Sequence, residues 1–237
     1  MKKITKILSV TSLILAGTGA VFAQCADISA PGVWDFVKTG TNPVVATTAN
    51  PLSGTCSMAV PVQAGKRYVQ DDMSAESTIR GSFQIDPNSL VMPTSGQQRK
   101  IKVHQVQCGA GCSSGSTVDW LQAKLRLQPG DVYKLGIWAR EDNENKISTS
   151  VNLVDGCNTI EYQLISGNPG TFRLWVNNTN EGAPDFESTT ANFSNRFADR
   201  VRLGRSGTGT NIVVGSEFYL DTFESRRQTF IGNSCTP

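Results

Sequence analysis

The sequence has 237 residues, of which 22 are basic, 20 are acidic and 38% are hydrophobic, and its formal net charge is +2. This balance implies neither the strongly basic composition of a nucleic-acid-binding protein nor a polybasic membrane patch. The length is ample for a large buried core.

The first 23 residues predict a signal peptide. Three lysines lie among the first six residues, residues 7–16 are mainly apolar, and Val21-Phe22-Ala23 fits a cleavage site. Removing the three lysines leaves 19 basic against 20 acidic side chains, a net charge near −1. We expect a secreted mature chain, periplasmic or extracellular, with no membrane anchor and no nucleic-acid partner. It would start at Gln24 and form a single β-sandwich domain over residues 24–237.

All six cysteines follow this segment, and an even number in an oxidising compartment predicts disulfides. Proximity along the chain, and a terminus that needs tethering, favour the pairs Cys25–Cys56, Cys108–Cys112 and Cys157–Cys235. The close spacing of Cys108 and Cys112 could instead hold a metal, but His104 is the only histidine and partner ligands are missing. We therefore expect no cofactor.

Short runs that alternate at period two predict the secondary structure. In chain order they cover residues 78–86, 99–107, 118–127, 131–140, 158–165, 171–177, 200–205 and 213–224. Turn residues such as Pro129-Gly130-Asp131 separate them, and no sustained helical period is present. The Gly/Ser stretch 108–117 is interpreted as a loop within one domain. The pattern predicts an all-β, two-sheet antiparallel sandwich or barrel.

Two groups of residues carry a family resemblance. They are Asp71-Asp72, Glu76, Arg80, Phe83, Asp86, Leu90 and Met92, and the C-terminal stretch Phe218-Tyr219-Leu220-Asp221-Thr222-Phe223-Glu224-Ser225-Arg226-Arg227. The chain resembles secreted bacterial proteins with concanavalin A-like (laminin G-like) jelly rolls over about residues 66–232. The resemblance implies a jelly-roll sandwich and no particular activity, because this fold serves many functions.

Three of the four tryptophans fall on the polar side of their predicted strands. With their long polar neighbours they form the predicted binding set: Trp120, Lys124, Arg126, Trp138, Arg140, Arg173, Trp175 and Asn177. Sugar rings stack on indoles while cations and amides bind hydroxyls and carboxylates, and Arg80 and Lys102 would extend a surface for an acidic glycan. The alternative is that these tryptophans pack under Arg and Lys stems or are covered by a loop.

Two catalytic functions are the alternatives to binding. A polysaccharide lyase could use Arg80, His104 and Tyr219, all on predicted polar faces, although the motifs around them match jelly-roll alginate lyases only loosely. A retaining glycosidase would need two close carboxylates, but the alternation separates Glu217 from Asp221 by four residues and turns Glu224 to the other face.

The acidic residues Asp71, Asp72 and Glu76 could contribute to a structural calcium site, but their spacing fits solvated turn carboxylates or partners of Arg80 better. No catalytic residue is assigned. The sequence favours a secreted, non-catalytic protein that binds glycan or another surface partner. The alternatives are a lyase acting on an acidic glycan and a structural component of the cell surface or an assembly.

Overall fold

A computed structural model describes residues 25, 27–30, 32–39, 44–62, 65–87, 90–91, 100–109, 112, 117–128, 132–207 and 215–235. The predicted signal peptide, Gln24 and the predicted turn at 129–131 lie outside these residues, as does most of the 108–117 loop. Within the described residues, no helix is long and apolar enough to cross a membrane.

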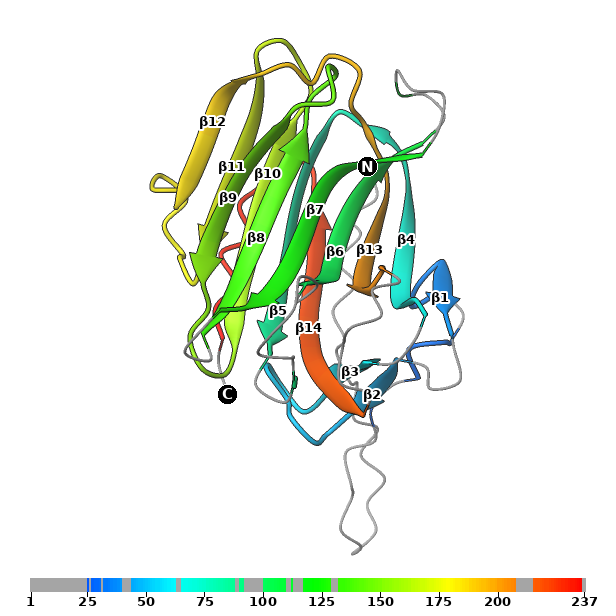
Figure 1. Cartoon of the computed structure of the whole chain (residues 1–237). Helices are drawn as coiled ribbons and strands as arrows, with labels where there is room; N and C mark the ends of the chain where they lie inside the picture. Colours follow the sequence, from blue (N-terminus) through cyan, green and yellow to red (C-terminus); the bar gives the residue numbers. More distant parts are fainter. Residues whose placement is uncertain are drawn as a thin grey trace, which may run out of the picture.

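The described chain folds into β-strands joined by turns and loops (Figure 1). The fourteen strands that these residues form are β1 (Phe36–Lys38), β2 (Val45–Thr47), β3 (Ser57–Val62), β4 (Arg67–Glu76), β5 (Thr78–Asp86), β6 (Lys100–Cys108), β7 (Val118–Leu127), β8 (Tyr133–Arg140), β9 (Lys146–Asn152), β10 (Asn158–Ile165), β11 (Gly170–Val176), β12 (Phe186–Ala191), β13 (Ala198–Arg205) and β14 (Ser216–Arg226).

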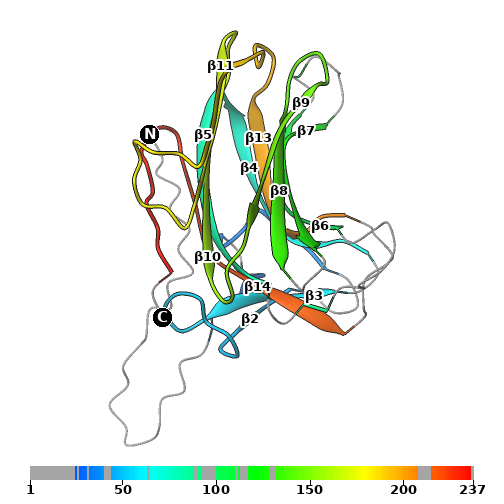
Figure 2. The same cartoon turned by 60° about the vertical axis from the view of Figure 1, so that its left-hand side comes forward.

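The strands form two seven-stranded antiparallel sheets that pack face to face (Figure 2). Sheet I has the order β1-β4-β13-β6-β7-β8-β9, and sheet II has the order β12-β11-β10-β5-β14-β3-β2. The predicted class, an all-β sandwich of two antiparallel sheets with disulfides, is confirmed.

Apolar side chains that alternate along the strands fill the space between the sheets. Sheet I contributes residues such as Leu125 and Leu135, and sheet II contributes residues such as Phe83 and Leu174, all at most 1% exposed. Each sheet therefore has one face in the core and one outer face, and a binding surface has to lie on an outer face or at an end of the sandwich.

The three disulfides pair Cys25 with Cys56, Cys108 with Cys112, and Cys157 with Cys235. The pairing predicted from chain proximity is confirmed. The last bridge ties the C-terminal segment to the turn before β10, across 78 residues of sequence.

A β-bulge in β6 changes which face His104 occupies. Lys102 pairs with Lys124, but His104 pairs with Ala123, so Val103 is an additional residue in β6. A one-residue insertion reverses the alternation that follows it, and Val103 and His104 consequently both point into the core.

A second bulge has the same effect on Trp120. Val106 pairs with Leu121 and Gln107 with Asp119, so Trp120 is an additional residue in β7. Trp120 and its neighbour Leu121 both lie in the core, which strict alternation excludes.

A third irregularity lies in β14, where Asp221 pairs with Gln84 and Glu224 with Ser82. Phe223 turns into the core, and Glu224 lies on the same outer face as Asp221. The prediction that Glu224 faces the other way is wrong.

The alternation missed several strands, including β4 and β9. Strand β9 carries mainly Ser, Thr, Asn and Lys, so its apolar signal is weak, and β4 contains the acidic group that we interpreted as a turn. Asp71 is buried in β4, Asp72 forms an ion pair with Arg200, and Glu76 forms one with Arg227. The prediction of turn carboxylates is wrong.

Candidate functional site

The eight predicted binding residues do not share one surface. Trp120 lies in the core, and the other seven divide between the two sheets. Sheet I carries Lys124, Arg126, Trp138 and Arg140, whereas sheet II carries Arg173 and Trp175, with Asn177 directly after β11. The prediction of a common tryptophan face is wrong, because period-two alternation specifies a face within a strand and not the sheet to which the strand belongs.

Trp120 is a core residue. Its side chain is 0% exposed and packs edge-on against Phe193, with ring centroids 5.7 Å apart. A ligand cannot reach this indole.

Trp175 lies on the outer face of sheet II but is covered. Its ring is 1% exposed and packs against Phe230 of the C-terminal segment, with centroids 5.3 Å apart. The Arg80 guanidinium lies 5.0 Å from the centroid, and the indole N–H donates to the carbonyl of Glu181 at 3.3 Å. The alternative of a tryptophan covered by a loop therefore describes Trp175.

Residues 227–235, here called the C-terminal strap, are held against the outer face of sheet II by hydrogen bonds and a disulfide. The Glu161 carboxylate accepts the backbone N–H groups of Ile231 at 3.0 Å and Gly232 at 2.9 Å. Gln84 donates to the carbonyl of Ser234 at 3.0 Å, and the Cys157–Cys235 disulfide secures the end. Burial raises the pKa of Glu161.

The other two predicted residues of sheet II have structural partners. Arg173 forms an ion pair with Glu187 and donates to Gln163 at 3.1 Å. The Asn177 side chain accepts the N–H of Thr159 at 2.8 Å, from a backbone with a φ of 54°. This position suits Asn, which tolerates the left-handed region.

The outer face of sheet I is different in character. The register aligns its side chains in rows across β6, β7, β8 and β9. One row is Lys100, Arg126, Lys134 and Asn152, the next is Lys102, Lys124, Gly136 and Ser150, and the third is Gln105, Gln122, Trp138 and Ser148. We call these twelve residues the basic face. In Figures 1 and 2 the strap lies on the far side of the sandwich from it.

Trp138 is the partly exposed indole of this face. The Arg140 guanidinium lies 5.3 Å from its ring centroid and the Lys146 ammonium 4.9 Å. Lys146 belongs to the edge strand β9 and is exposed. Two cations therefore flank the Trp138 ring, one of them on the exposed edge strand.

Asp119, at the border of the basic face, organises its amides. Its carboxylate accepts the side-chain amides of Gln105 at 2.6 Å, Gln107 at 2.8 Å and Gln122 at 2.6 Å, and Lys102 lies 3.4 Å away. Sequence reasoning missed Asp119 and the two glutamines of β6. The alternation predicts that Gln105 and Gln107 lie on one face of β6. That both bond to one carboxylate follows only from the pairing of β6 with β7.

The predicted lyase residues do not meet. His104 is 0% exposed between the sheets, its Nε2 lies 2.9 Å from the Tyr162 hydroxyl, and burial lowers its pKa to about 3. Tyr219 lies on the outer face of sheet II, where it donates to Glu217, and Arg80 is covered by the strap. A lyase centre built from His104 and Tyr219 is therefore excluded by their positions on opposite sides of sheet II.

Asp221 and Glu224 of β14 share the outer face of sheet II, and both side chains are buried. Asp221 is 3% exposed, accepts the N–H of Ser53 at 3.0 Å, and burial raises its pKa to about 6. Glu224 forms an ion pair with Arg226. Among the described residues, no group of three His, Cys, Asp or Glu side chains is placed to hold a metal.

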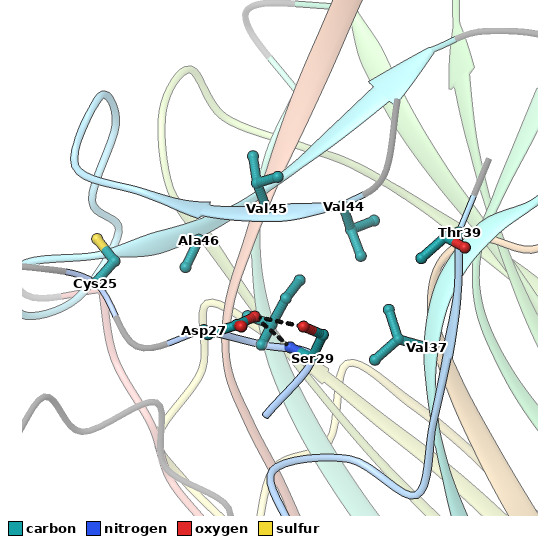
Figure 3. A pocket seen from close by; sticks show the side chains of 9 residues that line it. Cys25, Asp27, Ser29, Val37, Thr39, Val44, Val45 and Ala46 are labelled. Carbon is teal, nitrogen blue, oxygen red and sulfur yellow. Dashed lines mark hydrogen bonds between the residues drawn. The ribbon is translucent and has the colours of Figure 1, made fainter. Parts of the chain in front are cut away.

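A cavity of about 290 Å³ lies where the short edge strands β1 and β2 come together (Figure 3). Its walls are mainly apolar, including Ile28, Val37 and Val44. Asp27 accepts hydrogen bonds from the Ser29 N–H at 2.8 Å and hydroxyl at 2.6 Å, which close a turn at its rim. Among the described residues that line the cavity, no set of polar groups converges in the way that fixes the orientation of a ligand.

No protein-family model matches the sequence, and no curated protein matches it. Solved structures share the fold. The receptor-binding domain of botulinum neurotoxin type G aligns with a TM-score of 0.52 and 7% identity, over 82% of this chain and 43% of that chain. The alginate lyase Aly36B aligns with a TM-score of 0.52 and 11% identity, over 75% of this chain and 84% of that chain.

A third structure is the ligand-binding domain of botulinum neurotoxin serotype D in complex with N-acetylneuraminic acid. It aligns with a TM-score of 0.53 and 11% identity, over 83% of this chain and 43% of that chain. This chain thus spans less than half the length of the toxin chains. At such low identity the likeness defines the class of fold, a β-sandwich shared by carbohydrate-binding domains and a lyase, and does not choose between binding and catalysis.

Proposed function

We propose that this protein is secreted and binds a glycan, without catalysis, through the basic face of sheet I. The observation that carries the proposal is the combination on one outer face of a partly exposed indole, Trp138, with the partly exposed cations Lys124 and Arg126. Flat indoles and directional polar groups are the two elements that sugar recognition requires.

The contrast with sheet II supports the choice of surface. On sheet II, Trp175 and Arg80 are already covered by the C-terminal strap, whose Phe230 lies against both. On the basic face, the exposed Ser148, Ser150 and Asn152 continue the polar surface to the edge of the sheet.

The fold neighbours are in accord with glycan binding. One of them is a toxin domain in complex with N-acetylneuraminic acid, and another is an alginate lyase. A non-catalytic role fits this chain better than lyase chemistry, because the histidine and tyrosine that a lyase centre could use are buried or face away from the basic face.

Intrinsic fluorescence tests the proposal directly. Trp34, Trp120 and Trp175 are each at most 7% exposed, so a sugar that stacks on the protein changes the emission of Trp138. We expect a saturable change on titration with at least one member of a panel of neutral and acidic polysaccharides. Trp138→Phe should abolish the change and Trp175→Phe should preserve it; the absence of binding across the panel contradicts the proposal.

A further inference from the structure

Arg126 lacks the partners that other arginines of the two sheets have. Arg80, Arg173 and Arg226 each form an ion pair with a glutamate. In the ranges that the structure describes, Arg126 has no ion pair and its buried Nε has no hydrogen-bond partner. A guanidinium N–H that is withdrawn from water without an acceptor is costly, and an anion that bonds to it offsets that cost.

The position of Arg126 depends on a glycine in the neighbouring strand. A Cβ on Gly136 would lie 3.2 Å from Nη2 and 3.3 Å from Nε of Arg126, so the guanidinium lies across the backbone of β8. Gly136 is the register partner of Lys124. The absence of a side chain at residue 136 therefore brings the guanidinium toward the row that holds Lys124.

Four lysines surround the guanidinium, and together with Arg126 we call them the cation patch: Lys100, Lys102, Lys124, Arg126 and Lys134. Lys100 and Lys134 are the two register partners of Arg126, and Lys102 is a partner of Lys124. Within the described residues, the one carboxylate in ion-pair contact with the patch is Asp119, which is 3.4 Å from Lys102.

The positive charges of the patch lower the pKa of one of its own lysines. Burial lowers the pKa of Lys124, and the neighbouring Lys102, Lys100, Lys146 and Arg126 lower it further. Like charges held this close repel one another, and an anion placed among them removes the repulsion. The expected mature chain has a net charge near −1, so the patch is a local feature and not the result of a generally basic protein.

We propose that the glycan is acidic and that Arg126 binds one of its carboxylate or sulfate groups, with Lys100, Lys124 and Lys134 around it. This inference rests on the proposed function and adds its ligand class. A planar guanidinium offers two parallel N–H donors to either anion, which an ammonium cannot do. Trp138, one row beyond Lys124, would then contact an uncharged ring of the same chain.

Matched pairs of polymers separate this inference from the proposed function. Calorimetric titrations would compare polygalacturonate with its methyl ester, and dextran sulfate with dextran, at low salt. We expect each acidic polymer that binds to do so at least about tenfold more tightly than its neutral partner, and to weaken as salt screens the charges. Equal affinity within each pair overturns the inference and leaves the proposed function standing, whereas no binding by any polymer overturns both.

The same titrations decide between carboxylate and sulfate as the preferred group. Inorganic polyphosphate serves as a polyanion that has no rings to stack on Trp138. Binding of polyphosphate as tight as that of the best acidic glycan would overturn the inference, because the patch would then be a non-specific anion surface.

Substitutions at residue 126 test the role of the guanidinium. Arg126→Gln should lower affinity for the acidic polymer about tenfold, and Arg126→Lys, which keeps the charge, should lower it by a smaller factor of about three. Lys66→Gln, which removes an exposed charge elsewhere, is the control and should have no effect. Unchanged affinity of Arg126→Gln overturns the inference.

Discussion

The two outer faces of the sandwich carry similar residue types and differ in what covers them. Sheet II presents Trp175, Arg80 and Glu161, yet the C-terminal strap occupies all three. Sheet I presents Trp138 and Arg126, and its cations have few acid partners among the described residues. Among the described residues, similar side chains are therefore buried on one face and partly exposed on the other.

Truncating one tryptophan on each face should give the largest contrast. Trp175→Ala removes a fully buried indole and should lower the free energy of unfolding by about 3–5 kcal/mol. Trp138→Ala removes a partly exposed one and should cost less than about 1 kcal/mol. Denaturant unfolding followed by circular dichroism measures both; equal losses would refute the distinction between the faces.

Interior His104, which lies between the two faces, should make stability depend on pH. Its folded-state pKa of about 3 is below the ordinary value of 6.5, so the unfolded chain binds the proton first. Stability should therefore fall by up to about 1.4 kcal/mol per pH unit as the pH drops from 6.5 toward 3.

His104→Gln is the control for this titration, because Gln can still bond to the Tyr162 hydroxyl without titrating. Asp221, whose pKa is raised to about 6 from 3.8, acts with the opposite sign and is present in both proteins. The difference between wild type and variant therefore reports His104. A difference that does not change between pH 6.5 and pH 4 would contradict burial of a neutral imidazole.

Removing the disulfide at the end of the strap tests whether the outer face of sheet II contributes to stability alone or also binds glycan. Replacing both Cys157 and Cys235 with Ser removes a bridge across 78 residues and should cost about 2–4 kcal/mol. Glycan binding at the basic face should be unchanged, because the strap lies on the opposite side of the sandwich. Thermal unfolding and fluorescence titration at a temperature where the variant is folded check both; a gain of glycan affinity would show that sheet II also binds.

The smallest effect is expected from Gly136→Ala on sheet I. The new methyl group would meet Nη2 of Arg126 at 3.2 Å, and this flexible guanidinium can move aside at little cost. Stability should change by less than about 0.5 kcal/mol, while affinity for an acidic glycan should fall about threefold, under 1 kcal/mol. Ser150→Ala, in the same row, is the matched control. A loss of stability without a loss of affinity would contradict this prediction and show that Gly136 matters for folding and not for binding.

The errors of sequence interpretation concentrate at the three irregular strand positions. The alternation predicts the wrong face for His104, Trp120 and Glu224; Trp120 is itself the additional residue in β7, and the other two lie beside the irregular positions in β6 and β14. Regular runs such as Thr78–Asp86 were placed correctly, because nothing interrupts their alternation. Four of the eight predicted binding residues lie on sheet I, namely Lys124, Arg126, Trp138 and Arg140.

The sequence by itself determined the all-β class, the pairing of the cysteines and the inward residues of the regular strands, since these depend on local alternation and chain proximity. Only the tertiary structure decided which sheet each strand joins, where an additional residue turns a side chain inward, and which face the strap covers. Those outcomes depend on contacts between residues far apart in sequence. For this reason the two faces, indistinguishable as sequence, differ as surfaces.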